Sequence, residues 1–447
     1  MMTMPNGGDT ISYSTSQFVD EMDQVSLGLI ALGLQPGERV ALISHNNRCE
    51  WNLMDHGTLQ AGGIDVPIYP TMTPDDYVYI LNHSESRFCF VSNADLFQKV
   101  SSIQDQIPSL EAIFTFDKVD GARSWREVTE LGAAAEAETK AELEKRRNEV
   151  VQEDMATIIY TSGTTGRPKG VMLSHKNIAQ NAIHSIPRLP ERVAGTEYRV
   201  LSFLPVCHIF ERMLHYLYMH EGAKIHFGES LETVKDDLAA AQPHMFTAVP
   251  RLLEKFHDAI VAKGREAGGV KSAIFNWAVG LALEWEPDGR NGAFYEWKLG
   301  IARKLVFDKV KAALGLTEIM AVACGSAALA PRLARFFNGA GIPVYEGYGL
   351  TETSPVVSVN SLNASDMLRI GTVGKLIEDT EVNIAEDGEI LVKGHQVMMG
   401  YFKDEEKTAE VLKNSWFHTG DIGVIEDGFL RITDRKKEMF KTSGGKY

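Results

Sequence analysis

Hydrophobic and polar positions along the first third of the chain follow two spacings in turn. In residues 14–34, Phe18, Met22, Val25 and Leu29 recur at steps of four and three, the spacing of one helix face. Short apolar runs stand at residues 38–44, 64–69 and 87–92, with helical segments around 51–61 and after residue 74. Alternating strands and helices are typical of a doubly wound parallel sheet, so we expect a first α/β subdomain over residues 1–150.

The same alternation continues through a second expected subdomain, residues 151–370. Residues 155–160 (MATIIY) are typical of a buried strand, and residues 171–183 (VMLSHKNIAQNAI) have the spacing of a helix. Further strand candidates lie at 199–205, 224–227, 245–249, 319–324 and 343–348. From Gly371, apolar and polar positions alternate between glycine turns, which predicts a smaller β-rich subdomain, a barrel, over residues 371–435.

A largely helical insertion is expected at residues 270–314. It carries a row of large aromatic residues at helical spacing, Trp277, Trp285, Trp297 and Phe307. Such a row is more often part of a core than of a ligand surface, so we favour burial.

Composition narrows the class of protein. The chain has 447 residues, 44% of them hydrophobic, and a net charge of −15. That charge argues against a nucleic-acid partner, which would need a basic surface. The four cysteines form no CxxC pair, so we expect reduced, buried thiols in a cytoplasmic protein. Because no apolar stretch approaches a membrane span, any membrane contact is expected to be peripheral.

The segment 161–170, TSGTTGRPKG, predicts a phosphate-binding loop after the strand at 155–160. It combines glycines for close backbone approach, hydroxyl donors and one cation. These residues are Thr161, Ser162, Gly163, Thr164, Thr165, Gly166 and Lys169. The spacing is not that of a Walker A loop, which has four residues between its last glycines. A flexible surface loop is the alternative, and the flanking strand makes it the weaker one.

Two acidic positions add candidate chemistry. Thr351 and Glu352 follow a predicted strand, and a carboxylate beside a triphosphate needs a divalent cation between them, for which Mg²⁺ is the natural choice. A helix N-cap is the alternative at this position. Asp421, in WFHTGDIG, is a candidate partner for ribose hydroxyls if it lies at a strand end, and otherwise belongs to a turn.

Arg435 and His208 are weaker candidates. Arg435, in ITDRKKE, could contact sugar or phosphate, or belong to a solvated basic face. His208, in LPVCHIFER, follows an apolar strand and a proline, and chemistry alone favours a structural role.

Together these motifs, TSGTTGRPKG, LPVCHIFER, YGLTET, WFHTGD and DRKKE, resemble the adenylate-forming superfamily in order and spacing. The texture around PHMFTAVPRLLEKFHDAI and the helical insertion is similar to long-chain fatty acyl-CoA synthetases. The resemblance implies ligation of a fatty acid to CoA through an acyl-adenylate, with ATP, Mg²⁺ and CoA as cofactors. It also implies the fold of that family's large N-terminal domain, with two α/β subdomains and a barrel subdomain.

The resemblance also assigns roles by motif position. Tyr348 is expected to stack on adenine, Thr351 to contact the α-phosphate, and Asp421 with Arg435 to bind the ribose. His208 is expected near the carboxylate, at the mouth of the acyl site, while Lys169 with the loop donors is expected to hold the phosphates during catalysis. Mg²⁺ is expected on Glu352, with Thr161. The adenine pocket is expected to be completed by Gly325, Ser326, Ala327, Glu346, Gly347 and Gly349.

The last residues, 436–447, match the family's hinge, at Lys436 or Lys437, and the start of its C-terminal domain. A lysine of that domain contacts the reacting groups in the family. We therefore expect slow adenylation and poor transfer to CoA, since losing such a contact costs about 10² to 10³ in rate.

Alternative functions stay open on the sequence alone. One is an adenylating ligase for another acid or for an acceptor other than CoA. Another is an idle nucleotide- or lipid-binding module. Oligomeric state is also open, with a homodimer among the alternatives.

Overall fold

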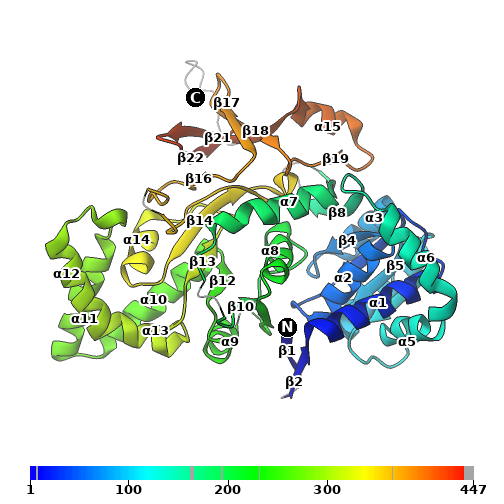
Figure 1. The fold of residues 1–447 in the computed structure, drawn as a ribbon, viewed down its shortest axis with the longest axis horizontal. Coiled ribbons are helices and arrows are strands. Elements are labelled where there is room, and N and C mark those ends of the chain that lie inside the picture. Colours follow the sequence, from blue (N-terminus) through cyan, green and yellow to red (C-terminus); the bar gives the residue numbers. More distant parts are fainter. Residues whose placement is uncertain (7–8, 162–165, 193–194, 231, 365, 437–447) are drawn as a thin grey trace.

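The computed structural model describes residues 1–447 except 7–8, 162–165, 193–194, 231, 365 and 437–447. Two large mixed sheets lie side by side, with helices on their faces, and a small antiparallel sheet lies above them (Figure 1). This arrangement confirms the expected α/β fold with a β-rich subdomain.

The first sheet has the strand order β19-β9-β8-β4-β3-β5-β6-β7. Its strands are β3 (Arg39–Ile43), β4 (Ile64–Ile68), β5 (Ser86–Val91), β6 (Ala112–Thr115), β7 (Arg123–Ser124), β8 (Met155–Thr161), β9 (Lys169–Ser174) and β19 (Gly400–Tyr401). Its helices are α1 (Thr15–Ala31), α2 (Cys49–Gln60), α3 (Pro74–Ser84), α4 (Ala94–Ser101), α5 (Arg126–Ala134) and α6 (Glu136–Glu149). The predicted elements of residues 14–92 are therefore confirmed.

Local sequence explains where these helices begin. Ser14 caps α1 and Thr73 caps α3, each in a reciprocal capping box, and Pro74 occupies the first turn of α3. Strand β4 is buried along its whole length, which is typical of a parallel strand covered by helices on both faces.

The helix predicted over residues 171–183 begins later than expected. Residues 169–174 form β9, which pairs antiparallel with β8, and α7 (His175–Ser185) starts only after the capping residue Ser174. The phosphate-loop motif therefore joins two strands of a hairpin rather than a strand and a helix. Strand pairing decides this: Val171 and Leu173, two residues apart, are both buried in the sheet, and this spacing is that of a strand.

The second sheet has the order β16-β15-β14-β13-β12-β10-β11-β1-β2. Its strands are β1 (Met2–Asn6), β2 (Asp9–Tyr13), β10 (Arg199–Ser202), β11 (Lys224–Phe227), β12 (Met245–Ala248), β13 (Ala321–Cys324), β14 (Val344–Gly349), β15 (Val356–Val359) and β16 (Lys375–Leu376). Its helical segments include α8 (Ile209–His220), α9 (Val234–Ala241), α10 (Pro250–Glu266), α14 (Pro331–Gly339) and the turn η2 (Ile186–Arg188). All strands predicted within residues 199–348 are present.

The helical insertion comprises α11 (Gly269–Leu283), η3 (Pro287–Gly289), α12 (Ala293–Ala302), a π-helical turn η4 (Arg303–Phe307) and α13 (Asp308–Leu314). Its aromatic row is only half buried. Trp285 and Phe307 are in the core, whereas Trp277 and Trp297 are 40% and 62% exposed. Burial was therefore the wrong expectation for two of the four residues.

The small sheet, called the half-barrel below, contains β17 (Thr380–Ile384), β18 (Glu389–Gly394), β20 (Leu412–Lys413), β21 (Trp416–Glu426) and β22 (Phe429–Arg435), with α15 (Glu405–Val411) beside it. Between its strands the chain returns to the first sheet, where β19 pairs with β9. The half-barrel is therefore attached to the body by backbone hydrogen bonds at the base of the loop motif.

Helix α8 joins the two large sheets through buried polar contacts. Arg212 is fully buried and binds Asp55 at 2.5 Å, Asp65 at 3.0 Å and the hydroxyl of Thr157 at 2.7 Å, all from the first sheet and its helix α2. Burial alone would raise the pKa of Asp55, but Arg212, His56 and the Tyr216 hydroxyl together outweigh it and hold that pKa below its usual value. Burial raises the pKa of Asp65 well above its usual value, so one carboxylate balances one guanidinium.

Neighbouring residues of α8 bind the second sheet. Glu211 accepts hydrogen bonds from the hydroxyls of Ser202 at 2.5 Å and Thr247 at 2.6 Å, and His215 contacts Ser202 at 2.6 Å.

The four cysteines are free and buried, as expected. No helix in the described ranges has the length and hydrophobicity needed to cross a membrane.

Candidate active site

The loop motif lies at the end of the β8–β9 hairpin. Thr161 ends β8, Lys169 begins β9, and the two residues pair across the hairpin. Four of the predicted phosphate-binding residues, Ser162, Gly163, Thr164 and Thr165, lie outside the described residues. Gly166 has φ +122°, and no atom lies within 4 Å of the position that a Cβ would take. The Gly166 end of the loop is thus open to free space, three residues before Lys169.

Lys169 is connected to Glu352 through one aromatic ring. The Lys169 Nζ lies 4.3 Å from the centre of the Tyr401 ring, and the Tyr401 hydroxyl donates to the Glu352 Oε1 at 2.9 Å. Burial, helped by the nearby Glu352 carboxylate, raises the pKa of Tyr401. Tyr401 therefore stays neutral. Its ring contacts the Lys169 ammonium group and its hydroxyl donates to the Glu352 carboxylate.

The turn carrying Thr351 and Glu352 is held rigidly. Residues 351–353 form a 3₁₀ turn, and the Thr353 hydroxyl donates to the Pro355 carbonyl at 2.6 Å. From the segment leading to β19, the Met398 N–H donates to the Glu352 carbonyl at 2.9 Å. A Cβ on Gly349 would overlap the carbonyl oxygen of Pro355, so this position requires glycine. The turn and the segment before β19 thus fix the backbone that carries the Glu352 side chain.

Tyr348, Asp421 and Arg435 form a second connected group. The Tyr348 hydroxyl donates to the Asp421 Oδ2 at 2.7 Å, and the Arg435 Nε donates to the Asp421 Oδ1 at 3.1 Å. Burial and the adjacent Asp421 raise the pKa of Tyr348 well above its usual value. Asp421 lies inside the eleven-residue strand β21, paired with Arg435 of β22, rather than at the strand end that the sequence suggested.

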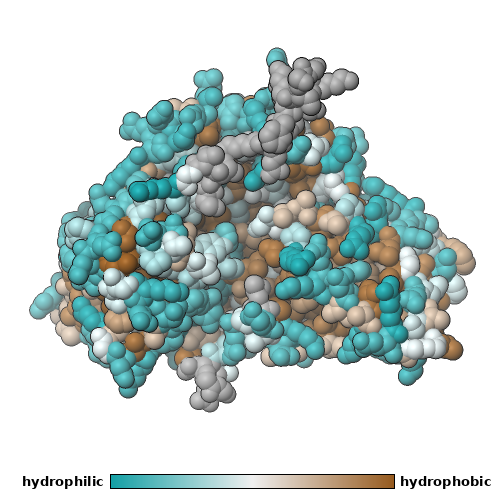
Figure 2. Space-filling view, turned by 180° about the vertical axis from the view of Figure 1, so that it is seen from behind, coloured by the Kyte–Doolittle hydropathy of each residue, from teal (hydrophilic) through white to brown (hydrophobic). Residues whose placement is uncertain are grey.

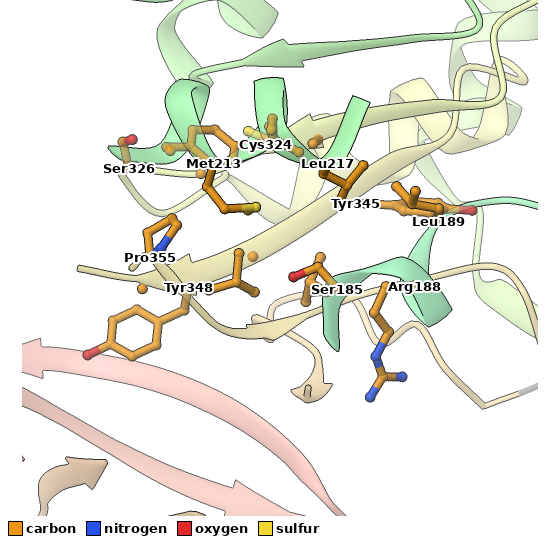
Figure 3. Close-up of a pocket in the computed structure, with 18 of the residues that line it drawn as sticks. Ser185, Arg188, Leu189, Met213, Leu217, Cys324, Ser326, Tyr345, Tyr348 and Pro355 are labelled. Carbon is orange, nitrogen blue, oxygen red and sulfur yellow. The ribbon is translucent and has the colours of Figure 1, made fainter. Parts of the chain in front are cut away.

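A mainly apolar cavity of about 690 Å³, its open mouth included, extends from this group into the second sheet. Figure 3 shows Tyr348 at one end, with its hydroxyl directed toward the half-barrel strands, and Arg188 at the other, with its guanidinium turned away. Helix α8 contributes Phe210, Met213, Leu214 and Leu217 to the lining. The predicted pocket residues that line the cavity are Gly325, Ser326, Gly347, Tyr348 and Gly349.

Turn η2 closes the end of the cavity away from Tyr348. Arg188 donates to the Leu376 carbonyl at 2.6 Å, and the Ser361 hydroxyl donates to the Arg188 carbonyl at 3.0 Å. The walls of the cavity are mainly apolar and suit a hydrocarbon chain or an aromatic ring.

Two predicted pocket residues have other surroundings. The Glu346 carboxylate is buried and accepts a hydrogen bond from the Leu329 N–H at 2.9 Å, and burial raises its pKa to about 7. Ala327 is exposed and is not among the residues that line the cavity. Glu346 thus holds the loop after β13 rather than facing the cavity.

His208 immediately precedes α8. Its ring packs edge-on against Tyr69, with 4.7 Å between the ring centres, and is exposed at the surface. Desolvation by the surrounding protein lowers the pKa of its imidazole, which is therefore neutral at pH 7. Phe210, two residues further on, lies on the cavity wall beside Gly325, so His208 lies near the cavity but not in its lining.

The donor set fits a magnesium nucleotide. Lys169 forms no ion pair with any carboxylate of the described residues, so its charge is available to phosphate oxygens. That part of the chain also contains no group of three or more His, Cys, Asp or Glu side chains able to hold a metal. Mg²⁺ commonly binds through one or two protein ligands and completes its shell with phosphate and water, so Glu352 with Thr161 suits it.

Sequence reasoning did not find Tyr401, and no motif marks it. It becomes a site residue only because β19 leaves the half-barrel to pair with β9. The cavity-lining residues of α8 did carry a signal, since 210, 213, 214 and 217 share one helix face. That face could have been predicted as a pocket wall, although the same spacing also fits a core.

The fold of the chain matches solved structures over nearly its whole length. It matches the inhibitor-bound N-terminal domain of FACL13 from Mycobacterium tuberculosis, with a TM-score of 0.72 over 97% of this chain and 95% of that one, at 22% identity. It also matches the anthranilate CoA ligase AuaEII in complex with anthranoyl-AMP, with a TM-score of 0.71 over 99% of this chain and 76% of that one, at 20% identity.

The AMP-binding enzyme family model matches residues 3–402. The chain therefore belongs to this family, the adenylate-forming acyl-CoA ligases. It is 36% identical over 435 residues to the long-chain-fatty-acid–CoA ligase FadD15 of Mycobacterium bovis, covering 96% of this chain and 70% of that protein. It is 35% identical over 452 residues to the long-chain-fatty-acid–CoA ligase ACSBG2 of Xenopus laevis, covering 97% of this chain and 60% of that protein.

The chain thus spans 60% to 70% of the length of these two relatives. It corresponds to almost all of the FACL13 N-terminal domain, as the sequence resemblance predicted.

Proposed function

We propose that this chain activates a long-chain fatty acid with ATP, as the nucleotide-binding part of a fatty acid–CoA ligase. The observation that carries the proposal is the mainly apolar cavity beside Tyr348 and its partner Asp421. An apolar chain and a nucleotide could meet there. The similarity to FadD15 and ACSBG2, both named as long-chain ligases, supports this substrate class.

In the proposed first step, a carboxylate oxygen of the acid attacks the α-phosphorus of ATP. The bond from that phosphorus to the bridging oxygen breaks, and pyrophosphate leaves with the electron pair. This chemistry needs positioning and charge neutralisation more than it needs covalent help. In the second step the thiolate of CoA attacks the acyl carbon and AMP leaves.

Each side chain has a proposed part in this reaction. Lys169 and the 161–166 loop bind the phosphates, Thr351 contacts the α-phosphate, and the aromatic ring of Tyr348 covers the adenine. Asp421 and Arg435 bind the ribose, and neutral His208 lies toward the carboxylate. Bound Mg²⁺, held by Glu352 and Thr161, would supply positive charge against the triphosphate.

The division into subdomains 1–150, 151–370 and 371–435, with a hinge in 436–447, stays a prediction. Strands β8 and β9 lie in the first sheet, so the first two units share it. Cytoplasmic location and peripheral membrane contact are likewise proposals.

Acid-dependent pyrophosphate release tests the function. We expect release with ATP, Mg²⁺ and palmitate that exceeds release with acetate or benzoate, because each buried methylene adds about 0.8 kcal/mol to binding. Equal release with benzoate would favour an aryl acid ligase. ATP binding with no acid-dependent release under any condition would contradict the proposal in favour of a binding module.

A matched pair of variants distinguishes an effect on substrate binding in the cavity from an effect on protein stability. Met213→Trp, which fills the cavity, should abolish release with palmitate while acetate-dependent release persists. Met219→Trp, also on α8 but outside the cavity lining, is the control and should keep the wild-type preference.

A further inference from the structure

Helix α12 and the π-helical turn that follows it carry an outward apolar stripe. Its members are Phe294, 70% exposed, Trp297, 62% exposed, and Leu305, 49% exposed. They recur at steps of three and eight, so they lie on one side of the continuous helix. The stripe lies at the end of the molecule that α11 and α12 build, and Figure 2 shows hydrophobic residues reaching the surface there.

The inward face of α12 is buried against the rest of the protein. Tyr295, Leu299 and Ala302 are buried, and the Tyr295 hydroxyl donates to the Leu281 carbonyl of α11 at 2.6 Å. The exposed stripe therefore contributes nothing to the core, and leaving two large aromatic rings in water is unfavourable. Neighbouring α11 adds a second exposed stripe, Val270 at 75% and Trp277 at 40%.

Basic side chains border this apolar face. The Lys298 Nζ lies 4.8 Å from the centre of the Phe294 ring, and Lys304 is exposed. Residues 293–314 contain five Lys or Arg and two acidic residues, in a chain whose net charge is −15. The charge of this segment is thus opposite in sign to that of the whole protein.

We propose that the outward face of α12, with Trp277 of α11, docks on an anionic phospholipid bilayer. Trp and Phe partition into the interfacial layer of a bilayer, and Lys side chains reach the phosphates around them. A two-fold contact with a second copy would bring two positively charged segments together, which disfavours that occupant. The inference does not depend on the proposed reaction, because it concerns a surface outside the described cavity.

Vesicle flotation with the full 447-residue chain tests the proposal. The probes are vesicles of phosphatidylcholine and vesicles with about 30% phosphatidylglycerol, because about 1 kcal/mol per lysine is gained near an anionic surface. We expect binding to the anionic vesicles and a blue shift of tryptophan emission. The double variant Phe294→Ser, Trp297→Ser should bind at least about tenfold more weakly. The pair Val151→Ser, Ile425→Ser, exposed elsewhere, should bind like the wild type.

A second variant, in which two lysines are replaced by glutamate, tests the proposal without changing the aromatic residues. Lys298→Glu with Lys304→Glu should weaken binding to anionic vesicles by about tenfold or more and change binding to phosphatidylcholine little. Lys140→Glu with Lys145→Glu on α6 makes the same change in net charge and should have no such effect. The proposal is overturned if the wild type does not float with anionic vesicles or if the α6 pair matches the α12 pair. It is also overturned if light scattering shows a dimer that the aromatic variant dissociates, since the face would then cover a second copy.

Discussion

Lys169 is a half-buried cation that lies over the face of the Tyr401 ring. Replacing it with Met keeps the length of the side chain and removes the charge. We expect pyrophosphate release to fall by about 10² to 10³, because a charge that stabilises a phosphoryl transition state is lost. The free energy of unfolding should change by less than about 1 kcal/mol, since no carboxylate among the described residues loses an ion pair.

Lys176→Met is the matched control for that variant. Lys176 also follows the loop motif but is a surface residue that binds Glu153 at 3.3 Å. Stopped-flow or coupled measurement of pyrophosphate should show wild-type rates for it. Comparable losses in both variants would contradict the assignment of Lys169.

Glu346 makes the stability of the protein depend on pH. Burial raises its pKa from 4.5 in the unfolded chain to about 7 in the folded one. The folded state therefore holds a proton that the unfolded state has released, and stability present below pH 4.5 is lost as pH rises to 7. The free energy of unfolding falls by up to about 3 kcal/mol over this pH range.

Glu346→Gln should remove this loss, so the variant should gain stability over the wild type at pH 8 and little at pH 5. Urea denaturation at both pH values measures it. Glu130→Gln, at an exposed position of α5, should leave the difference between the two pH values unchanged. A wild type whose stability is the same at both values would refute the role given to Glu346.

Sequence reasoning proposed site residues where a motif has a local signature. The glycines, hydroxyls and cation of 161–170 and the YGLTET turn could be read from the chain. Tyr401 could not, because its contacts with Lys169 and Glu352 arise from a strand pairing more than 200 residues apart in sequence. Glu346 has the residue type of a site carboxylate, and only its burial against Leu329 reveals a structural contact.

At the scale of elements, α8 is the helix that both large sheets bind. Arg212→Met should lower the free energy of unfolding by about 3 to 5 kcal/mol, because it leaves the Asp55 carboxylate buried without its partner. Guanidinium chloride denaturation followed by circular dichroism measures the change.

A double-mutant cycle supplies the control. Asp55→Asn in the Arg212→Met background should recover part of the loss, since the orphaned charge is then absent. Strictly additive effects of the two substitutions would show that the pair does not couple the sheets.

Element prediction from the sequence was accurate for buried parallel strands and less so at two places. The run 171–183 was predicted to be helical, yet pairing with β8 makes its first four residues part of strand β9. The aromatic row of the insertion has helical spacing, but periodicity cannot tell which face meets the core when a helix is apolar nearly all round. Trp285 and Phe307 are buried there, while Trp277 and Trp297 are exposed.

At the scale of the whole molecule, two histidines meet where the half-barrel rests on α7. The rings of His184 and His395 stack with 4.3 Å between their centres, near Asp379 of the half-barrel and Lys176 of α7. Desolvation, helped by the charge of His184, lowers the pKa of His395 to about 4. Keeping His395 neutral therefore adds to the free energy of unfolding above about pH 6.5, the pKa of histidine in the unfolded chain. This contribution is lost as the pH falls toward 4.

His395→Asn should make the protein less sensitive to acid. Between pH 7 and pH 5 its denaturation midpoint should fall less than that of the wild type. His220→Asn, at an exposed position, should behave like the wild type. A wild type and a His395→Asn variant with the same pH dependence would exclude this contact as a source of acid sensitivity.

The order of strands in the first sheet has a consequence for how the protein behaves at high concentration. The sheet ends in β19 on one side and β7 on the other, and each of these strands has two residues. A long free edge would offer unpaired backbone groups to the next molecule and seed fibrous aggregates. Here both edges are too short for that, so overexpression and storage at high concentration should not promote end-to-end growth from this sheet.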